Sequence, residues 1–495
     1  MQANMQENTS GRPNIIFINT DQHTWNVISA YGYPHVHTPN IDRLHENGIS
    51  FMRSYSTDPV CAPTRASWMT GRYTSEAGTP FNGGHLHEDM PDLGQTLRAG
   101  GYRAIHCGKW HVDGRDVHQS FDVLYGGQEP IGAGGGEYYD GAITHAAVDF
   151  LTSDTSNQPF YLQIAYLNPH DICEYGHNHE DKVIPDAVAQ ELLSEDILPP
   201  LPDNFDYDER EPVLHRVCRR EDESLIHWRI LRVVRNWSAL QWRYFMWSHH
   251  RFVEKVDSEI GMVLAALEQS RYRDNTLILF SVDHGEAFGQ HQMFQKFTLY
   301  EESIRVPFIV ASLAESRNDN LNIPKATFDH THFVSGVDLL PTVCDYASIA
   351  PPDDVQGMSI RPLVEGKPTE WRDFAYVESN YWGRALIFDR YKYVCEYMPH
   401  GNDDDLLPPG PDVQRLGVEQ VFDLVDDPLE TRNLAYDAEM HEQVQGFRQA
   451  LLNFEGQLQR RRITHENPMR VIRQWGARVK AFWDAHPALL DGYRV

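Results

Sequence analysis

The chain has 495 residues and a net charge of -28, from 43 Lys and Arg against 71 Asp and Glu, and 41% of its residues are hydrophobic. This length and composition fit a large α/β domain with a smaller companion, able to bury an extensive core. The acidic balance argues against a nucleic-acid partner, because phosphate backbones require clustered Lys and Arg.

The N-terminal residues 1–12 are polar and lack the apolar region of a secretory signal. They predict a cytoplasmic protein, or a periplasmic or secreted one if a signal segment has been removed. No later apolar run is long enough to span a bilayer, so we expect no membrane partner. The six cysteines occur singly, without a CxxC pair, which favours free thiols over a disulfide framework or a zinc ribbon.

Strand and helix patterns then alternate along the chain. Short apolar runs typical of buried strands occupy residues 14–20, 102–107, 160–167, 276–282 and 307–311. Helical patterns occupy residues 39–47, 92–99, 141–151 and 236–267, the first with Thr38 as its expected N-cap. This alternation predicts right-handed crossovers and an α/β fold with a mostly parallel sheet sandwiched by helices.

Two regions depart from this alternation. Residues 171–235 are polar and contain prolines, and we interpret them as an insertion that shapes the substrate cleft. From Trp371 onward, short strands at 374–378, 385–388 and 391–396 predict an antiparallel sheet, and helical segments close the chain. The sequence therefore predicts an α/β domain over residues 1–365 and a smaller C-terminal α+β domain over residues 366–495.

Polar residues follow four of the predicted strands. They are Asp21 and Gln22, Lys109 and His111, His170 and Asp171, and Asp283 and His284. Ligands of an open parallel sheet bind beyond the carboxyl ends of its strands, so we expect these residues to share one site. Asp21 and Asp283 offer the hard oxygen ligands that suit a divalent cation such as calcium. Lys109, His111 and His170 suit an anionic substrate and proton transfer.

Each of these residues also has an ordinary explanation when it is taken alone. An Asp after a strand usually caps a turn, a Lys in a turn is usually solvated, and a single His is usually a surface or hydrogen-bonded residue. The prediction of a site depends on their shared position at one edge of the sheet. Similarly, Trp25, Tyr381 and Trp382 could stack on a sugar ring, although core packing is the more common role of such residues.

The segment at residues 59–67 contains the pattern Cys61-x-Pro63-x-Arg65. Pro63 suits the first turn of a helix, where its missing N–H group costs little. Cys61 would then lie near the helix N-terminus, where the helix dipole favours negative charge. Two interpretations follow from the residues: a buried structural cysteine, or a thiolate nucleophile activated by the dipole and by Arg65.

This segment resembles the formylglycine signature of the sulfatase family, within the alkaline-phosphatase-like superfamily. Cys61, Pro63 and Arg65 match Cys-x-Pro-x-Arg, and the usual extension is matched at Ala66, Ser67, Thr70, Gly71 and Arg72. The resemblance covers most of the chain, since it continues at residues 13–21, 38–44, 108–111, 283–286 and 422–434. It implies an alkaline-phosphatase-like fold and hydrolysis of sulfate esters.

The resemblance also implies a role for each residue of the site. A formylglycine-generating enzyme would oxidise Cys61 to formylglycine, whose hydrate attacks sulfur while Arg65 steadies it. Asp21, Gln22, Asp283 and His284, together with the modified Cys61, would bind one divalent cation, Ca²⁺ or alternatively Mn²⁺ or another ion. Lys109 and Lys296 would hold the sulfate oxygens. His111 would take the remaining hydroxyl proton, and His170 would protonate the leaving-group oxygen, a role that it could share with Lys296.

The pairs Asp21-Gln22 and Asp283-His284 differ from the Asp-Asp and Asp-Asn pairs of many arylsulfatases. They are similar to pairs in choline sulfatases, carbohydrate sulfatases and phosphonate monoester hydrolases. We therefore expect a sulfatase that acts on a small anionic or sulfated glycan. Two alternatives remain open: a phosphonate monoester or phosphodiester hydrolase that uses the same site, and a non-catalytic protein that binds anionic glycans. The oligomeric state is left open as well.

Overall fold

The computed structural model describes residues 11–127, 135–174, 194–207, 211, 215, 237–315, 321–379, 383–397 and 416–459. Most of the predicted insertion at residues 171–235 lies outside these ranges, as do Tyr381 and Trp382. Among the described helices, none combines the length and the apolar character needed to cross a bilayer.

The larger sheet has eight strands in the order β4-β3-β5-β1-β6-β7-β2-β8. In chain order these strands are β1 (Asn14–Asp21), β2 (Gly48–Tyr55), β3 (Arg103–Lys109), β4 (Asp122–Gly127), β5 (Phe160–Pro169), β6 (Thr276–Val282), β7 (Phe308–Ala311) and β8 (Thr327–Ser335). All neighbouring pairs are parallel except those of β7, which is antiparallel to both β6 and β2. The prediction of a mostly parallel sheet is thus confirmed.

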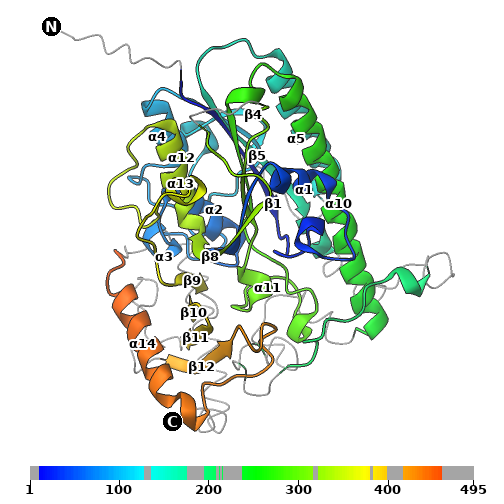
Figure 1. Cartoon of the computed structure of the whole chain (residues 1–495), viewed down its shortest axis with the longest axis vertical. Coiled ribbons are helices and arrows are strands. Elements are labelled where there is room, and N and C mark those ends of the chain that lie inside the picture. Colours follow the sequence, from blue (N-terminus) through cyan, green and yellow to red (C-terminus); the bar gives the residue numbers. More distant parts are fainter. Residues whose placement is uncertain are drawn as a thin grey trace.

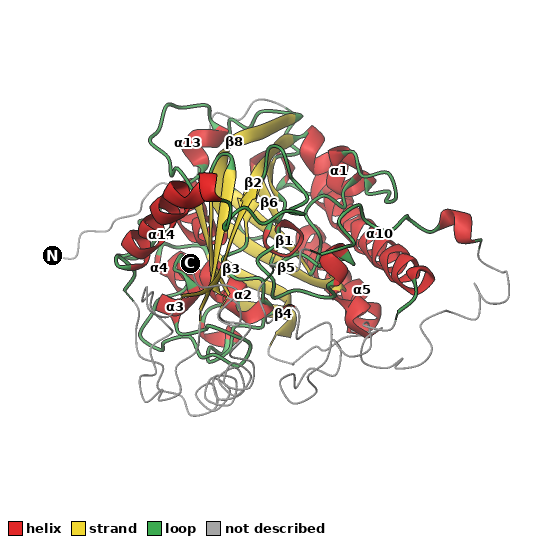
Figure 2. Ribbon diagram, turned by 90° about the horizontal axis from the view of Figure 1, so that it is seen from below, coloured by secondary structure: helices red, strands yellow, loops and turns green. Residues whose placement is uncertain are grey.

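Helices cover both faces of this sheet, as Figure 2 shows. One face carries α1 (Pro39–Glu46), α5 (Gly135–Ser153) and α10 (Ala239–Gln269), and the other carries α2 (Cys61–Thr70), α4 (Leu93–Ala99) and α12 (Leu339–Ala347). Alternate residues of β1 explain the two cores: Ile16 and Ile18 pack under α10, while Ile15 and Phe17 pack under α2. The shorter helices are α3 (Thr74–Ala77), α11 (Glu301–Ile304) and α13 (Arg361–Val364).

The N-terminus of α1 is capped by a residue that the sequence did not indicate. Thr38 occupies the N-cap position, but its hydroxyl donates to Asp42 Oδ1 at 3.1 Å and makes no capping bond. Asp257 of α10 accepts the free N–H groups instead, from Asn40 at 3.1 Å and from Ile41 at 2.8 Å. The expected capping role of Thr38 is therefore wrong, because a carboxylate from a packed helix reaches these donors.

The smaller sheet is antiparallel, with strand order β12-β11-β10-β9. Its strands are β9 (Ala375–Ser379), β10 (Gly383–Ile387), β11 (Tyr391–Tyr397) and β12 (Leu416–Asp423), and α14 (His441–Glu455) packs on it. Figure 1 shows this sheet and α14 together at one end of the molecule. The predicted smaller α+β part is confirmed, while the domain boundary between residues 365 and 366 stays a prediction.

Candidate active site

Four strand ends meet at one edge of the larger sheet. Asp21 is the last residue of β1, and Lys109 is the last residue of β3. Asp283 follows β6, and His170 follows β5. Because β1 lies between β5 and β6, and β3 lies beside β5, these residues come from consecutive parallel strands of the sheet.

Arg65 of α2 ties these strand ends together. Its guanidinium donates to Asp21 Oδ2, to Asp283 Oδ2 and to the carbonyl oxygen of Lys109, each at 3.0 Å. Lys109 Nζ donates to the same Asp21 oxygen at 2.6 Å. All these groups are buried, so the site holds a dense network of charges with little access to water.

Cys61 is the first residue of α2, as Cys-x-Pro-x-Arg predicts. Its Sγ lies 3.1 Å from His284 Nε2 and 3.0 Å from Lys296 Nζ. Burial and the Asp21 carboxylate favour the neutral thiol, but Lys296, Lys109 and His284 outweigh them and hold the pKa of Cys61 well below its usual value. Position 61 is therefore a strongly electropositive point that favours a negatively charged atom.

The loop after β6 brings Lys296 to the same point. Lys296 Nζ donates to Gln22 Oε1 at 2.9 Å as well as approaching Cys61. Burial disfavours its charge, yet the negative groups Cys61 and Asp21 raise the pKa of Lys296, so it stays an ammonium. Gln22 has φ 61°, and its backbone N–H donates to Asp283 Oδ1 at 3.2 Å, which fixes the Gln22 backbone beside Asp283.

The donor set fits a divalent cation. Ligand atoms of Asp21, Cys61, Asp283 and His284 all lie within 4.8 Å of one another. Burial and the charge of Asp21 raise the pKa of Asp283. Two carboxylates repel each other at a buried point, and a bound cation would relieve that repulsion. The oxygen of Gln22 adjoins this set, and oxygen ligands suit a hard ion.

The two residues predicted to transfer protons, His170 and His111, differ in how clearly the structure places them at the site. Burial and the nearby Lys109 hold the pKa of His170 well below 6.5, and Asp21, Lys296 and Cys61 also act on it, so His170 lies beside the cluster. His111 follows Lys109 by two residues, is half-buried and has φ 50°. Its Nδ1 has no hydrogen-bond partner in the described part of the chain. Among the described residues, His111 is thus placed near the site only by its two-residue separation from Lys109, and its predicted role stays a prediction.

Two further predicted candidates have structural roles. The Asp171 carboxylate accepts from the N–H groups of Gly136 at 3.0 Å and Glu137 at 2.7 Å, at the N-terminus of α5. Trp25 packs beneath the guanidinium of Arg305, whose carbon lies 3.7 Å from the ring centroid. Trp25 thus packs against Arg305, and its stacking on a sugar ring stays a prediction.

Several residues that contact the site were missed as individual candidates. Asn82 Oδ1 accepts the N–H of Ala62 at 3.1 Å, in the first turn of α2. His249 of α10 lies 3.0 Å from the carbonyl oxygen of Gln22, and Glu286 contacts the Gln22 amide. Only Glu286 carried a signal, since it ends the matched segment 283–286. Asn82 and His249 come from distant segments with no recognisable spacing.

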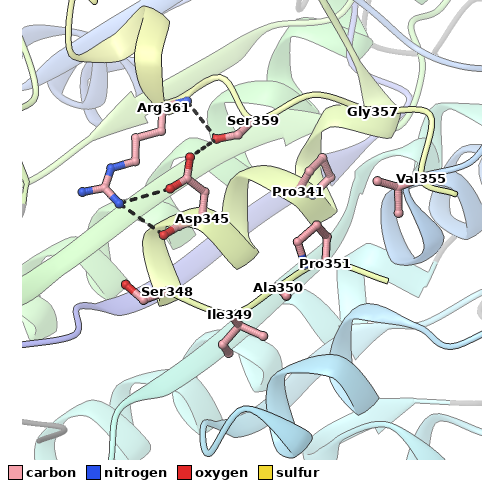
Figure 3. Close-up of a pocket in the computed structure, with 10 residues that line it drawn as sticks. All are labelled: Pro341, Asp345, Ser348, Ile349, Ala350, Pro351, Val355, Gly357, Ser359 and Arg361. Atoms are coloured by element: carbon pink, nitrogen blue, oxygen red, sulfur yellow. Dashed lines mark hydrogen bonds and ion pairs between the residues drawn. The ribbon is translucent and has the colours of Figure 1, made fainter. Parts of the chain in front are cut away.

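A hollow elsewhere on the molecule does not belong to this site. It measures about 580 Å³ and lies between α12 and α13 (Figure 3). One of its lining residues, Ile349, packs against Gly100, which precedes β3, so the hollow faces the opposite edge of the sheet. Arg361 and Ser359 donate to Asp345 at 3.2 and 2.6 Å. Its charges are paired internally, which makes it a poor site for an anion.

Comparison with known proteins relates this chain to sulfatases over most of its length. The sulfatase family model matches residues 13–349. The delta 4,5-hexuronate-2-O-sulfatase of Bacteroides thetaiotaomicron is 28% identical over 453 residues, covering 86% of this chain and 85% of that protein. The N-acetylglucosamine-6-O-sulfatase of the same organism is 26% identical over 521 residues, covering 88% and 85%. The phosphonate monoester hydrolase of Agrobacterium radiobacter shares the fold, with a TM-score of 0.70, 20% identity and coverage of 90% and 96%.

Proposed function

The chain belongs to the sulfatase family and is a sulfuric ester hydrolase, and from that premise we propose that its substrate is a sulfated carbohydrate. We assign the reaction to a formylglycine formed at Cys61 and to one divalent cation. The observation that carries this assignment is the convergence of Asp21, Cys61, Asp283 and His284 within 4.8 Å, beside two buried ammonium groups.

The cation is assigned to Asp21, Gln22, Asp283 and His284, with calcium as the first choice and manganese as the alternative. When bound, it supplies positive charge that polarises the ester and favours a negatively charged nucleophile. Arg65 holds both carboxylates through separate nitrogen atoms, so the ligands keep their positions before the ion arrives. Oxygen-rich ligation supports calcium.

The modified residue is assigned to position 61, and it supplies an oxygen nucleophile in place of the thiol. A separate formylglycine-generating enzyme is the maturation partner that this assignment requires. The chain contributes the surroundings: Lys296 and His284 lie about the Cys61 Sγ position at 3.0 and 3.1 Å. Those contacts support an oxyanion at the same point, because the Lys296 ammonium can donate a hydrogen bond to it and the cation that His284 would bind adds positive charge there.

Lys109 and Lys296 are assigned to the sulfate oxygens. A sulfate monoester carries a negative charge that repels nucleophiles, and two buried ammonium groups offset that charge. Both side chains are nearly inaccessible to solvent, at 4% and 5% exposure, so their charges are weakly screened.

His170 is assigned to the leaving-group oxygen. Burial and Lys109 keep its imidazole neutral in the free site, since they hold the pKa of His170 well below 6.5. An anionic ester adds negative charge beside it, which favours the protonated form when a substrate is bound. His111 is assigned to the proton of the nucleophile. Its half-buried position next to Lys109 supports this role.

The carbohydrate assignment is supported by two relatives that cover more than four fifths of the chain and act on sulfated hexuronate and N-acetylglucosamine. The test is the ratio of kcat/KM for a 2-O-sulfated unsaturated hexuronate disaccharide and for 6-O-sulfated N-acetylglucosamine to that for an aryl sulfate. We expect at least one sugar to exceed the aryl sulfate by about tenfold or more. Faster turnover of a phosphonate monoester than of every sulfate ester would contradict the proposal.

A further inference from the structure

The Glu286 side chain is fully buried three residues after Asp283, and its carboxylate is surrounded by N–H donors. Gln22 Nε2 donates to Oε2 at 2.5 Å. On the other oxygen, Oε1, the backbone N–H of Gln295 donates at 2.6 Å and that of Phe288 at 3.4 Å. A group that receives only donors acts as an acceptor, so this position requires two carboxylate oxygens.

These contacts close a ring around two residues of the active site. Gln295 directly precedes Lys296, and Lys296 Nζ donates to Gln22 Oε1 at 2.9 Å. One oxygen of Glu286 therefore holds the Gln22 amide, and the other holds the backbone next to Lys296. Gln22 and Lys296 also bond each other directly, so Glu286 bridges the two segments that carry them.

The segments that Glu286 holds have unfavourable backbone conformations. Gln22 has φ 61°, Gln295 has φ 68° and Phe297 has φ 83°, all in the left-handed region that residues other than glycine rarely adopt. Such conformations persist only where the surroundings fix them. Ser379 of β9 donates a hydrogen bond of 3.0 Å to the Phe297 carbonyl. Cys173 Sγ lies 3.3 Å from both Gln22 Oε1 and Gln295 Nε2, while Glu286 accepts the Gln22 side-chain N–H and the Gln295 backbone N–H.

We propose that Glu286 is a positioning residue, which turns the oxygen of the Gln22 amide toward Lys296 and the cation site and fixes the loop that carries Lys296. The inference rests on the proposed function of Gln22 and Lys296. Without an acceptor at its nitrogen, the Gln22 amide can rotate by half a turn and present its NH₂ group to the Lys296 ammonium. Two donors would then face each other, and the cation would lose an oxygen ligand.

The test compares Glu286→Gln with Glu302→Gln in otherwise identical protein. Glu302 is a matched control because it is a buried carboxylate on the adjoining α11, 4.0 Å from His291, and it contacts neither Gln22 nor Lys296 in the described residues. A glutamine at position 286 offers one oxygen where the site needs two acceptors. Thermal melting of both variants reports whether each is folded.

For Glu286→Gln we expect kcat on a sulfate ester and the calcium affinity measured by calorimetry each to fall on the order of 10- to 100-fold. Glu302→Gln should leave both unchanged. Adding Glu286→Gln to Gln22→Ala should weaken calcium binding no further, because Glu286 acts through that amide.

Wild-type kcat and calcium affinity in Glu286→Gln would overturn the proposal, and so would a fully additive loss of calcium affinity in the double variant. If Glu286→Gln does not fold, Glu286→Asp decides the question, since withdrawing the carboxylate by one methylene should still lower kcat. Absence of calcium binding to the wild type would overturn the cation assignment alone, and the kcat of Glu286→Gln would then decide the role of Glu286.

Discussion

Cys61 combines the two features that the sequence suggested for it, a place at a helix N-terminus and cationic neighbours. Its Sγ lies between Lys296 and His284, and Arg65 stands one turn along the same helix. The pattern Cys-x-Pro-x-Arg predicted the helix start because Pro63 suits a first turn. Lys296 was assigned only through the family resemblance, since nothing in its local sequence marks it.

The first prediction concerns Cys61 itself. Cys61→Ala should lower the turnover number by on the order of 10³-fold or more, because it removes the residue to which the nucleophile is assigned. Its melting temperature should stay close to that of the wild type, since the removed atom is small. Steady-state kinetics and thermal melting check this. The control is Cys344→Ala, which removes a buried thiol from α12 and should keep full activity. Near-normal activity in Cys61→Ala would contradict the assignment.

The proposed role of Glu286 could not be predicted from its own position in the sequence. The matched segment 283–286 drew attention to Asp283 and His284, which suit a metal, while a glutamate in a turn is usually solvated. Its importance depends on contacts with Gln22 and Gln295, which come from separate parts of the chain. Such contacts become visible only when the sheet brings β1 beside β6.

At the scale of elements, all five predicted strands of the larger sheet are observed, while its strands β2, β4 and β8 were missed. The strands at the centre, β1, β5 and β6, are continuous apolar runs buried on both faces. Of the missed strands, β4 and β8 lie at the two edges, where exposed residues alternate with half-buried ones over much of their length, whereas β2 lies inside the sheet and is mostly buried. Polar residues and glycines interrupt the apolar pattern of the missed strands. The antiparallel direction of β7 is set by its pairing with neighbouring strands and not by its own residues.

The second prediction concerns the junction of α5 and β5. Asp140 of α5 accepts the N–H groups of Leu167 and Asn168, at 2.8 and 3.0 Å, just before His170. Burial raises its pKa from 3.8 to about 7, despite these two hydrogen bonds. A raised acid pKa means that the folded state holds the proton more tightly than the unfolded state. The stabilisation is complete below pH 3.8 and is lost as the pH rises through about 7.

Asp140→Asn removes this titration. The free energy of unfolding of the wild type relative to Asp140→Asn should fall with rising pH across that window, by at most about 1.4 kcal/mol per pH unit. Urea denaturation across the window measures it. Asp149→Asn changes an exposed residue of the same helix, and its free energy of unfolding should vary with pH as that of the wild type does. A difference between wild type and Asp140→Asn that stays constant with pH would refute the argument.

At the scale of the whole molecule, the smaller sheet supports the active site directly. Ser379 of β9 donates to the Phe297 carbonyl at 3.0 Å, next to Lys296, and the Glu378 N–H donates to the Thr57 carbonyl at 2.8 Å, before Cys61. The sequence predicted both sheets and their order along the chain. It could not show that they meet at the loops that carry Cys61 and Lys296, because that contact joins segments about eighty residues apart or more.

The third prediction follows from the buried ligand set. Calcium that binds the folded chain alone should stabilise it, by about 2.7 kcal/mol at a free concentration of 100 times Kd. Exhaustive chelation should therefore lower both the melting temperature and the activity. Asp283→Asn should weaken the calcium dependence, because it removes one charged ligand. If complete metal removal changed neither stability nor turnover, the cation assignment would be wrong.

Modification of Cys61 is the central claim of this account, and peptide mass spectrometry tests it most directly. Protein produced together with a formylglycine-generating enzyme should yield a peptide around residue 61 in which an aldehyde replaces the thiol. Across preparations, the turnover number for a sulfate ester should rise in proportion to the converted fraction. Full turnover by protein whose Cys61 is entirely unmodified would contradict the claim.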